Sequence, residues 1–304
     1  MIKVGVLRGG IGDSYDASIS SGRYILSNLR SDKLNSDYKA IDIFVDIDGI
    51  WHIGGIPTTL EKVAEKVDLI FNALHGDYGQ NGNIQKLLEN YNIPYTGSDS
   101  STCAYISNGF SIKEDLSKIG VNIPSHILYG AYLEDLDGPQ DKYIKKITRD
   151  VLNRLSPPWV VKPINHSSSM GVFICKTIQD LMNAFNVGVH KNVSIIVEEI
   201  IEGRDTYVSV INNFRGKEIY PLLCTDNFTN NEKREVERLA ALVHDKLNLK
   251  HYSQSHFIVN PKKGIFLMEV NALPSLHEDS LLNKHLNDIG LSSHDFINHI
   301  IKSV

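Results

Sequence analysis

Two apolar runs in the first hundred residues constrain the fold more than any other feature of the chain. Residues 2–7 (IKVGVL) and 67–74 (VDLIFNAL) are rich in β-branched and other apolar side chains, and glycine follows each run. Between them, apolar residues at helical spacing indicate a helix over residues 19–29. This alternation predicts an open α/β domain with parallel strands, whose ligand-facing edge lies at Gly9-Gly10 and His75-Gly76.

The composition excludes several classes of protein. The 304 residues carry 31 Lys and Arg against 36 Asp and Glu, and this net charge of −5 argues against binding nucleic acid through a basic surface. No apolar stretch reaches the roughly 18 residues of a membrane span, and the charged N-terminal run is typical of a strand rather than a signal peptide. Three scattered cysteines indicate neither a zinc site nor a disulfide framework. We therefore expect a cytoplasmic protein without membrane or nucleic-acid partners.

The remainder of the chain predicts two further domains of mixed α and β structure. After Gly97 come a helix, a strand and a polar stretch over residues 135–146, and then two strands, 159–163 and 172–176, that form a hairpin. The last part combines strands, an amphipathic helix near Val236 and a hairpin over residues 256–271. The sequence thus predicts an α/β (α+β) fold with domains at residues 1–98, 99–197 and 198–304.

The last hairpin carries a candidate metal site. Glu269 and Asn271 are two residues apart, so they project from the same face of a strand. Carboxylate and amide oxygens are the ligands that Mg²⁺ prefers, and Mg²⁺ shares them with phosphates. The alternative is a solvated carboxylate next to an Asn that opens the turn before Pro274, and the spacing alone favours this alternative.

A lysine followed by a serine-rich loop is a candidate phosphate site. Lys162 ends a strand, and the loop Ile164–Gly171 contains three consecutive serines. Backbone amides and hydroxyls in such a loop can close over phosphates, although the pattern is not a P-loop. A serine-rich surface hairpin is the alternative.

Two further groups of residues are candidates for a functional role. Glu198 and Glu199 precede Ile200-Ile201, and Asp205 follows, so a carboxylate there could bind ribose while the main chain pairs with an adenine edge. Acidic residues at a strand end are usually solvated, which is the alternative reading. His75 closes a buried strand beside glycine, a placement that slightly favours function over packing.

The order of these motifs resembles the D-alanine–D-alanine ligases, a family of the ATP-grasp superfamily, across nearly the whole chain. The similar segments are VLRGG with SISSG, ALHGDYGQNGNIQKLLE, IPYTGS, VVKPINHSSSMGV, VEEIIEGRD and FLMEVNALPSLHEDSLL. The resemblance implies an ATP-grasp fold, in which an N-terminal α/β domain precedes two mixed domains that enclose the nucleotide.

The resemblance also implies a reaction and its site residues. ATP would phosphorylate one amino acid, and the amine of a second would attack the acyl phosphate. The implied catalytic residues are Ser168, Lys162 and Gln254. The implied nucleotide-binding residues are Lys162, Ser167, Ser168, Glu198, Glu199, Ile200, Ile201, Asp205 and Met268. The implied substrate residues are Ser14, Asp16, His75, Ser275, Ser280 and Leu281. The implied ligands of Mg²⁺ are Glu269, Asn271 and His256.

Several positions depart from the family pattern. Ser14 replaces a glutamate, and the family's second phosphate lysine falls near Asn108-Gly109, with Lys113 as the candidate substitute. Gln254 replaces an oxyanion-binding arginine, so it can donate a hydrogen bond but carries no charge. His256 replaces a metal-binding aspartate, and because imidazole is a softer ligand it leaves Mn²⁺ open beside Mg²⁺. Ser167 and Ser275 replace glycines, and a long site-covering loop after Leu223 is shortened.

These departures leave three hypotheses for the function. The first is a D-alanine–D-alanine ligase, or a close variant, that supplies peptidoglycan synthesis. The second keeps the chemistry but changes the acceptor, as in natural-product ligases. The third is a degenerate homologue that binds nucleotide without catalysis. The resemblance also implies a homodimer.

Overall fold

The computed structural model describes residues 1–164, 171–222 and 228–304. Contacts divide the chain into two compact units. Unit 1 comprises residues 1–107, 206–257 and 269–304, and unit 2 comprises residues 108–205 and 258–268. Most of the predicted third domain therefore groups with the predicted first domain, and the division into three domains stays a prediction.

The first sheet of unit 1 is the predicted open sheet. Its strand order is β4-β3-β2-β1-β5, and β1 pairs in parallel with both β2 and β5. The strands are β1 (Ile2–Gly9), β2 (Tyr38–Val45), β3 (Trp51–Ile53), β4 (Ile56–Thr58) and β5 (Leu69–Asn72). The helices are α1 (Tyr15–Leu29), α2 (Leu60–Ala64), α3 (Gly76–Gln80), α4 (Asn83–Asn90) and α5 (Ser100–Ser107). The parallel pairing confirms the interpretation of the two apolar runs.

A second sheet, of order β11-β10-β12-β13, contains the last hairpin. Its strands are β10 (Arg204–Phe214), β11 (Lys217–Pro221), β12 (Tyr252–Asn260) and β13 (Gly264–Asn271). The associated helices are α10 (Asn230–Lys246), α11 (Leu281–Asp288) and α12 (Ser293–Lys302). The outer parts of β10, β12 and β13 belong to unit 2, so this sheet supplies residues to both units.

One hydrophobic core joins the two sheets within unit 1. Ile25 and Leu29 on α1 pack in the same buried cluster as Ile211, Tyr252 and Phe296. These side chains are at most 1% exposed, so the cluster is closed to water. The helix predicted over residues 19–29 therefore buries its apolar face as its spacing indicated.

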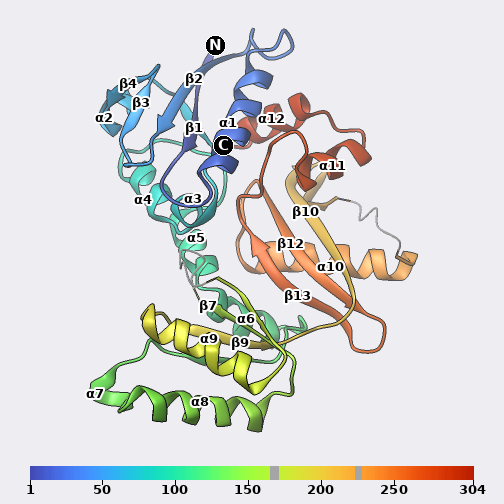
Figure 1. Ribbon diagram of the computed structural model, residues 1–304. Helices are drawn as coiled ribbons and strands as arrows, with labels where there is room; N and C mark the ends of the chain where they lie inside the picture. The colour runs from blue at the N-terminus through green and yellow to red at the C-terminus, as the bar shows by residue number, and fades with distance from the viewer. Residues whose placement is uncertain (165–170, 223–227) are drawn as a thin grey trace. The chain divides into compact units, whose positions relative to one another are not determined.

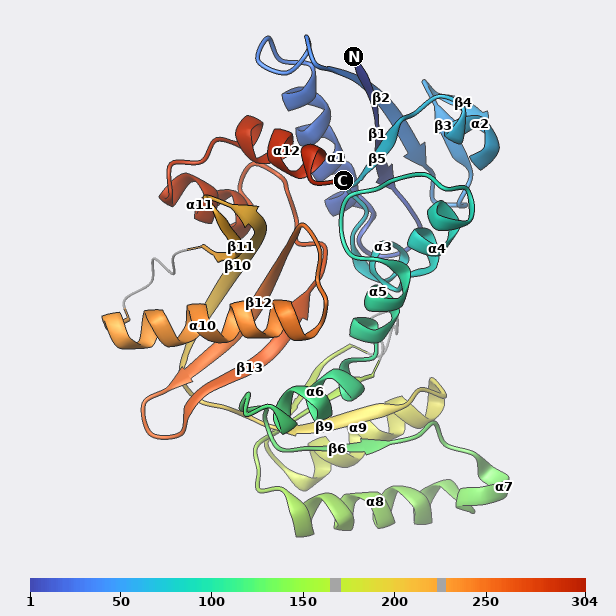
Figure 2. The ribbon, with the colours of Figure 1, turned by 180° about the vertical axis from the view of Figure 1, so that it is seen from behind.

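Unit 2 is built on an antiparallel sheet of order β6-β9-β7-β8, with α8 and α9 on one face (Figures 1 and 2). Its strands are β6 (His126–Tyr129), β7 (Trp159–Pro163), β8 (Phe173–Cys175) and β9 (Ile195–Glu199). Its helices are α6 (Gly109–Lys118), α7 (Glu134–Asp137), α8 (Gln140–Arg154) and α9 (Ile178–His190). The pairing of β7 with β8 confirms the predicted hairpin.

The expected polar stretch over residues 135–146 is instead α7 and the first turns of α8. Its charged residues hide a helical spacing, because Tyr143, Ile144, Ile147 and Val151 all face the core of unit 2.

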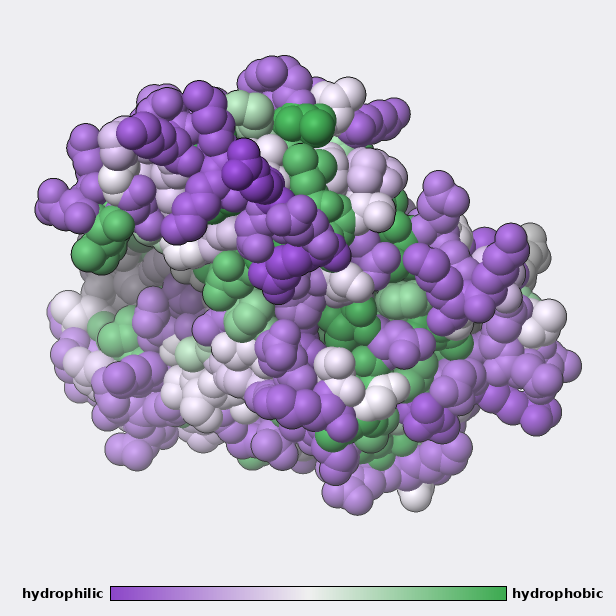
Figure 3. Space-filling model, turned by 90° about the horizontal axis from the view of Figure 1, so that it is seen from below, coloured by the Kyte–Doolittle hydropathy of each residue, from purple (hydrophilic) through white to green (hydrophobic). Residues whose placement is uncertain are grey.

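The surface is mainly polar where Figure 3 shows it, with apolar side chains gathered over part of that face. Within the described ranges, no helix combines the length and the apolar character that crossing a bilayer requires.

A buried histidine makes the stability of unit 1 depend on pH. His244 on α10 is 1% exposed, and its two ring nitrogens bond Ser253 Oγ at 2.7 Å and Asn212 Oδ1 at 2.9 Å. Burial lowers the pKa of His244 from 6.5 to about 4. Between these two values the unfolded chain binds a proton that the folded protein does not, so stability falls as the pH falls.

At pH 7 the wild-type protein should have a larger unfolding free energy than His244→Gln. We predict that this difference becomes about 3 kcal/mol smaller when the pH is lowered from 7 to 4. Urea unfolding of both proteins at the two pH values measures this change. A difference that stays constant would show that the folded and unfolded states protonate His244 alike, so that burial does not lower its pKa.

Candidate functional site

A buried carboxylate between two lysines forms the polar centre of unit 2. Glu198 on β9 is 2% exposed. One of its oxygens bonds Lys113 Nζ from α6, and the other lies 2.9 Å from Lys162 Nζ on β7. Burial raises the pKa of Glu198, but the two lysines lower it by more, so the pKa lies below its ordinary value and the carboxylate is charged.

The charges of this group leave a positive excess. Two ammonium groups face one carboxylate, and the side chain of Lys162 is 31% exposed while that of Lys113 is 8% exposed. Lys162 can therefore reach a phosphate while Glu198 holds its ammonium in place. Lys113, the candidate substitute for the family's second phosphate lysine, bonds the same carboxylate. The sequence named this lysine but could not place it beside Glu198.

The other candidate nucleotide residues of unit 2 surround the end of β9. Glu199 accepts a hydrogen bond from the backbone N–H of Ser125 at 2.8 Å, so it is not a freely solvated carboxylate. The backbone N–H of Ile200 donates to Pro158 at 3.4 Å. Ile201 is buried, Asp205 is exposed near the start of β10, and Met268 on β13 is half-buried. Their contacts with a nucleotide stay a prediction.

Four polar candidates of unit 1 share one face of the second sheet. On β12, Gln254 and His256 alternate with buried residues, and on β13 Glu269 and Asn271 flank the buried Val270. The ring of His256 stacks on that of Tyr207, with centroids 4.4 Å apart and planes 7° apart. The spacing argument that put Glu269 and Asn271 on one face agrees with this burial pattern.

The side-chain oxygen of Asn271 is already engaged in hydrogen bonds. It accepts the backbone N–H of Leu273 at 2.9 Å and the amide of Gln80 at 3.1 Å. The turn-opening role that the sequence left open is therefore real. The oxygen atoms present fit Mg²⁺ in chemical type, because Glu269 offers a carboxylate and Asn271 an amide oxygen. Asn271 can bind the metal only after its hydrogen bond with Gln80 is broken. Within the described residues, no three His, Cys, Asp or Glu side chains cluster as metal ligands.

His75 is held inside unit 1 by a complete set of hydrogen bonds. Its Nδ1 lies 3.1 Å from the carbonyl oxygen of Leu273, and its Nε2 lies 2.7 Å from Ser21 Oγ. Burial lowers the pKa of His75 to about 4, so the ring is neutral at pH 7. A carbonyl can only accept, so Nδ1 carries the proton and Nε2 accepts from Ser21. His75 thus fixes the loop after β13 against α1, and a contact with substrate stays a prediction.

The remaining substrate candidates of unit 1 lie at helix ends. Ser14 precedes α1, and its hydroxyl fills the space beside Gly76 where any side chain would clash. Ser280 Oγ accepts the backbone N–H of Asn283 and so caps α11, whose exposed first residue is Leu281. A helix N-terminus favours a carboxylate ligand, which fits the predicted role of these two residues. Ser275 is half-buried.

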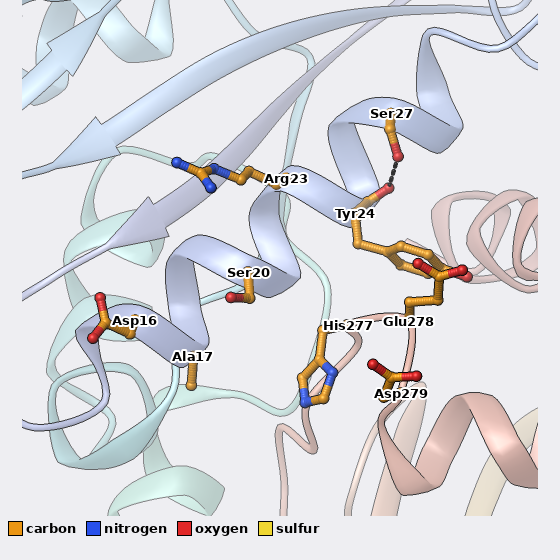
Figure 4. A pocket seen from close by; sticks show the side chains of 9 residues that line it. All are labelled: Asp16, Ala17, Ser20, Arg23, Tyr24, Ser27, His277, Glu278 and Asp279. Carbon is orange, nitrogen blue, oxygen red and sulfur yellow. Dashed lines mark hydrogen bonds between the residues drawn. The ribbon is translucent and has the colours of Figure 1, made fainter.

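Asp16 lines a pocket of about 620 Å³ along α1 (Figure 4). The opposite wall is formed by His277, Glu278 and Asp279. Arg23 contributes the guanidinium of this pocket, which therefore combines one strong cation with three carboxylates.

Sequence reasoning missed several residues of the candidate site. On β10, Tyr207 lies opposite His256, and Ser209 lies opposite Gln254. The sequence TYVSVI, with polar residues at every second position, could have revealed them. Ser167 and Ser168 lie outside the described residues. Residues 223–227 of the shortened loop also lie outside them.

Known D-alanine–D-alanine ligases are similar to this chain over nearly its whole length. The family model described as D-ala D-ala ligase C-terminus matches residues 130–223 and 215–302, and that described as D-ala D-ala ligase N-terminus matches residues 56–98. A D-alanine–D-alanine ligase of Fervidobacterium nodosum is 30% identical, with 98% of each chain covered. One of Aquifex aeolicus is 27% identical, covering 99% of this chain and 100% of the relative.

Solved structures share the fold. The VanG D-Ala:D-Ser ligase from Enterococcus faecalis gives a TM-score of 0.84 at 19% identity, with 99% of this chain and 98% of that chain covered. The D-alanine–D-alanine ligase from Bacillus anthracis complexed with ATP gives 0.79 at 23% identity, with 100% and 96% covered.

The family matches and the shared fold therefore place the chain among the ATP-grasp ligases, enzymes that join a carboxylate to an amine with ATP. The fold agrees with what the sequence predicted. Within that class, the chain belongs to the D-alanine–D-alanine ligase family.

We predict that Glu198→Gln lowers the unfolding free energy of unit 2 by about 3 kcal/mol, because it leaves Lys113 buried without a charged partner. The protein has two tryptophans, and Trp159 is buried in unit 2. Its fluorescence during urea unfolding, in a Trp51→Phe background, reports on this unit.

The adjacent Glu199→Gln variant is the matched control. Glu199 keeps partial access to water, so its loss should lower the unfolding free energy by about 1 kcal/mol. Equal effects of the two variants would refute a special role for the buried carboxylate.

Proposed function

We propose that the protein ligates two molecules of D-alanine with ATP. One observation carries the proposal: Lys113 and Lys162 meet on the buried carboxylate of Glu198. With Glu198 paired to both lysines, Lys162 would be free to meet a phosphate, and Lys113 would add a second positive charge from the buried side, in a chain whose sequence lacks the family's second lysine at its usual position. Membership of the family over the full chain supports the same reaction.

The proposed reaction has two steps. A carboxylate oxygen of the first D-alanine attacks the terminal phosphorus of ATP, and ADP leaves an acyl phosphate behind. The amine of the second D-alanine then attacks the acyl carbon, one amine proton is lost, and phosphate departs from the tetrahedral intermediate as the peptide bond forms. Both steps concentrate negative charge, so catalysis depends on positioning and on charge neutralisation.

The residues of this chain divide those tasks. Lys162, held by Glu198, would neutralise the phosphates, and Gln254 would donate a hydrogen bond to the tetrahedral oxyanion. The N-terminal turn of α11, at Ser280 and Leu281, would bind the carboxylate of the second amino acid. Glu269 and Asn271 would hold Mg²⁺, with His256 as the third candidate. When bound, Mg²⁺ neutralises charge on the phosphate oxygens.

A different acceptor is the second candidate function, and the pocket beside Asp16 favours it. Alanine has no charged side chain, whereas Arg23, Glu278 and Asp279 line a space of about 620 Å³ next to Ser280 in the sequence. An acceptor with a charged side chain would use these groups. We further propose that the reaction takes place in the cytoplasm, where ATP is available, that its product serves peptidoglycan synthesis, and that the enzyme is a homodimer.

The test is release of phosphate from Mg-ATP with a panel of D- and L-amino acids, including those with charged side chains. We expect turnover with D-alanine alone, together with formation of the dipeptide. Turnover that needs another amine would establish the second candidate. No turnover with any amino acid, with or without a thermal shift by Mg-ATP, would contradict both and leave the degenerate homologue.

Glu269→Gln should lower ATP-dependent turnover at least about a hundredfold, because an amide replaces a charged metal ligand. Glu218→Gln is the matched control, since Glu218 is an exposed carboxylate on β11 of the same sheet. Its rate should stay within twofold of the wild-type rate. Wild-type turnover by Glu269→Gln would remove Glu269 from the metal site.

A further inference from the structure

Gln254 is the first member of a chain of hydrogen bonds that leads to a buried histidine. Its Nε2 donates to Ser209 Oγ at 3.1 Å, and Ser209 Oγ lies 3.0 Å from His285 Nδ1. The three residues come from β12, β10 and α11, and all belong to unit 1. Ser209 is fully buried and His285 is 7% exposed, so water competes little for these bonds.

The position of Ser209 follows from strand pairing. Tyr207 stacks on His256, and Ser209 bonds Gln254. Two residues forward on β10 therefore correspond to two residues backward on β12, as in an antiparallel pair. Ser209 therefore lies directly across from Gln254 on the face that carries the candidate site. The buried His285 on α11 then closes the chain from the side of the helix.

The hydroxyl of Ser209 can link both neighbours. It accepts the hydrogen of the Gln254 amide, so its own single hydrogen is available for His285 Nδ1. Gln254 donates to Ser209, Ser209 donates to His285 in the tautomer whose Nδ1 carries no hydrogen, and the amide nitrogen of Gln254 is held toward β10. In the described part of the chain, the side chain of Gln254 makes no other hydrogen bond.

We propose that Ser209 and His285 are positioning residues that hold Gln254 as the donor to the reacting oxyanion. The inference rests on the proposed ligase function. An arginine at this position would bring a charge and five donors, whereas a glutamine offers one amide on a flexible stem. An oxyanion donor works when it is fixed before the charge develops, and the bond to Ser209 provides that fixation.

The same sheet contains a matched control. Ser253, next to Gln254 on β12, bonds His244 Nδ1 at 2.7 Å on the opposite, α10-covered face. This second buried serine–histidine pair resembles the first in chemistry and burial but does not contact Gln254. A loss of stability common to both pairs can thus be separated from an effect on Gln254.

The kinetic experiment compares Ser209→Ala with Ser253→Ala. We expect Ser209→Ala to lower kcat for ligation about tenfold with KM for ATP unchanged, and Ser253→Ala to change kcat less than twofold. In a Gln254→Ala background, Ser209→Ala should have no further effect on kcat. His285→Leu should behave like Ser209→Ala, whereas His285→Asn, which can place an acceptor near the position of Nδ1, should restore at least half of the lost rate.

A second measurement needs no turnover. In protein labelled with ¹⁵N at glutamine side chains, the Gln254 amide is assigned by its loss in Gln254→Ala. Its hydrogens should exchange with water at least about fivefold faster in Ser209→Ala and unchanged in Ser253→Ala.

The outcomes separate this inference from the proposed function. Equal losses of kcat in the two serine variants, an undiminished Ser209→Ala effect without Gln254, or unaltered exchange of the Gln254 amide would each overturn the positioning role. A wild-type protein without turnover would refute the ligase function, and the amide exchange would still report whether Ser209 holds Gln254.

Discussion

The buried ion group of Lys113, Glu198 and Lys162 is the interaction on which the functional account depends. A carboxylate that is 2% exposed is stable as an ion here because two ammonium groups compensate its loss of water. The group joins α6, β7 and β9, and it leaves one positive charge in excess. The phosphate binding that we propose for unit 2 would therefore use the same contacts that hold the unit together.

In the second sheet of unit 1, Gln254 and His256 stand where the family pattern has an arginine and an aspartate, and their contacts, like those of Asn271, are specific. Gln254 is tied to Ser209, Asn271 to Gln80 and to its own turn, and the ring of His256 stacks on Tyr207. Each of these contacts fixes a side chain without adding charge. In the proposed reaction, charge neutralisation would then fall mainly to Lys162 and to the metal ion, while this sheet would position the reacting groups.

Local patterns in the sequence predicted much of this structure. Period-two spacing put Glu269 and Asn271 on one face, and the apolar runs before glycine gave the parallel strands β1 and β5. The helix α8 escaped prediction because its charged residues hide the apolar spacing. The contact of Lys113 with Glu198 joins residues 85 positions apart, so no local pattern could reveal it. The sequence likewise could not show that the oxygen of Asn271 is shared with Gln80, because that depends on how the distant helix α3 packs.

The most direct test of the central claim follows an oxygen atom. D-alanine labelled with ¹⁸O in its carboxylate is incubated with the enzyme and Mg-ATP, and the released phosphate is analysed by mass spectrometry. Ligation through an acyl phosphate transfers one labelled oxygen from the first amino acid to phosphate in each turnover, and the account predicts this transfer. Phosphate free of ¹⁸O alongside newly formed dipeptide would contradict it, because the carboxylate would then never have been phosphorylated.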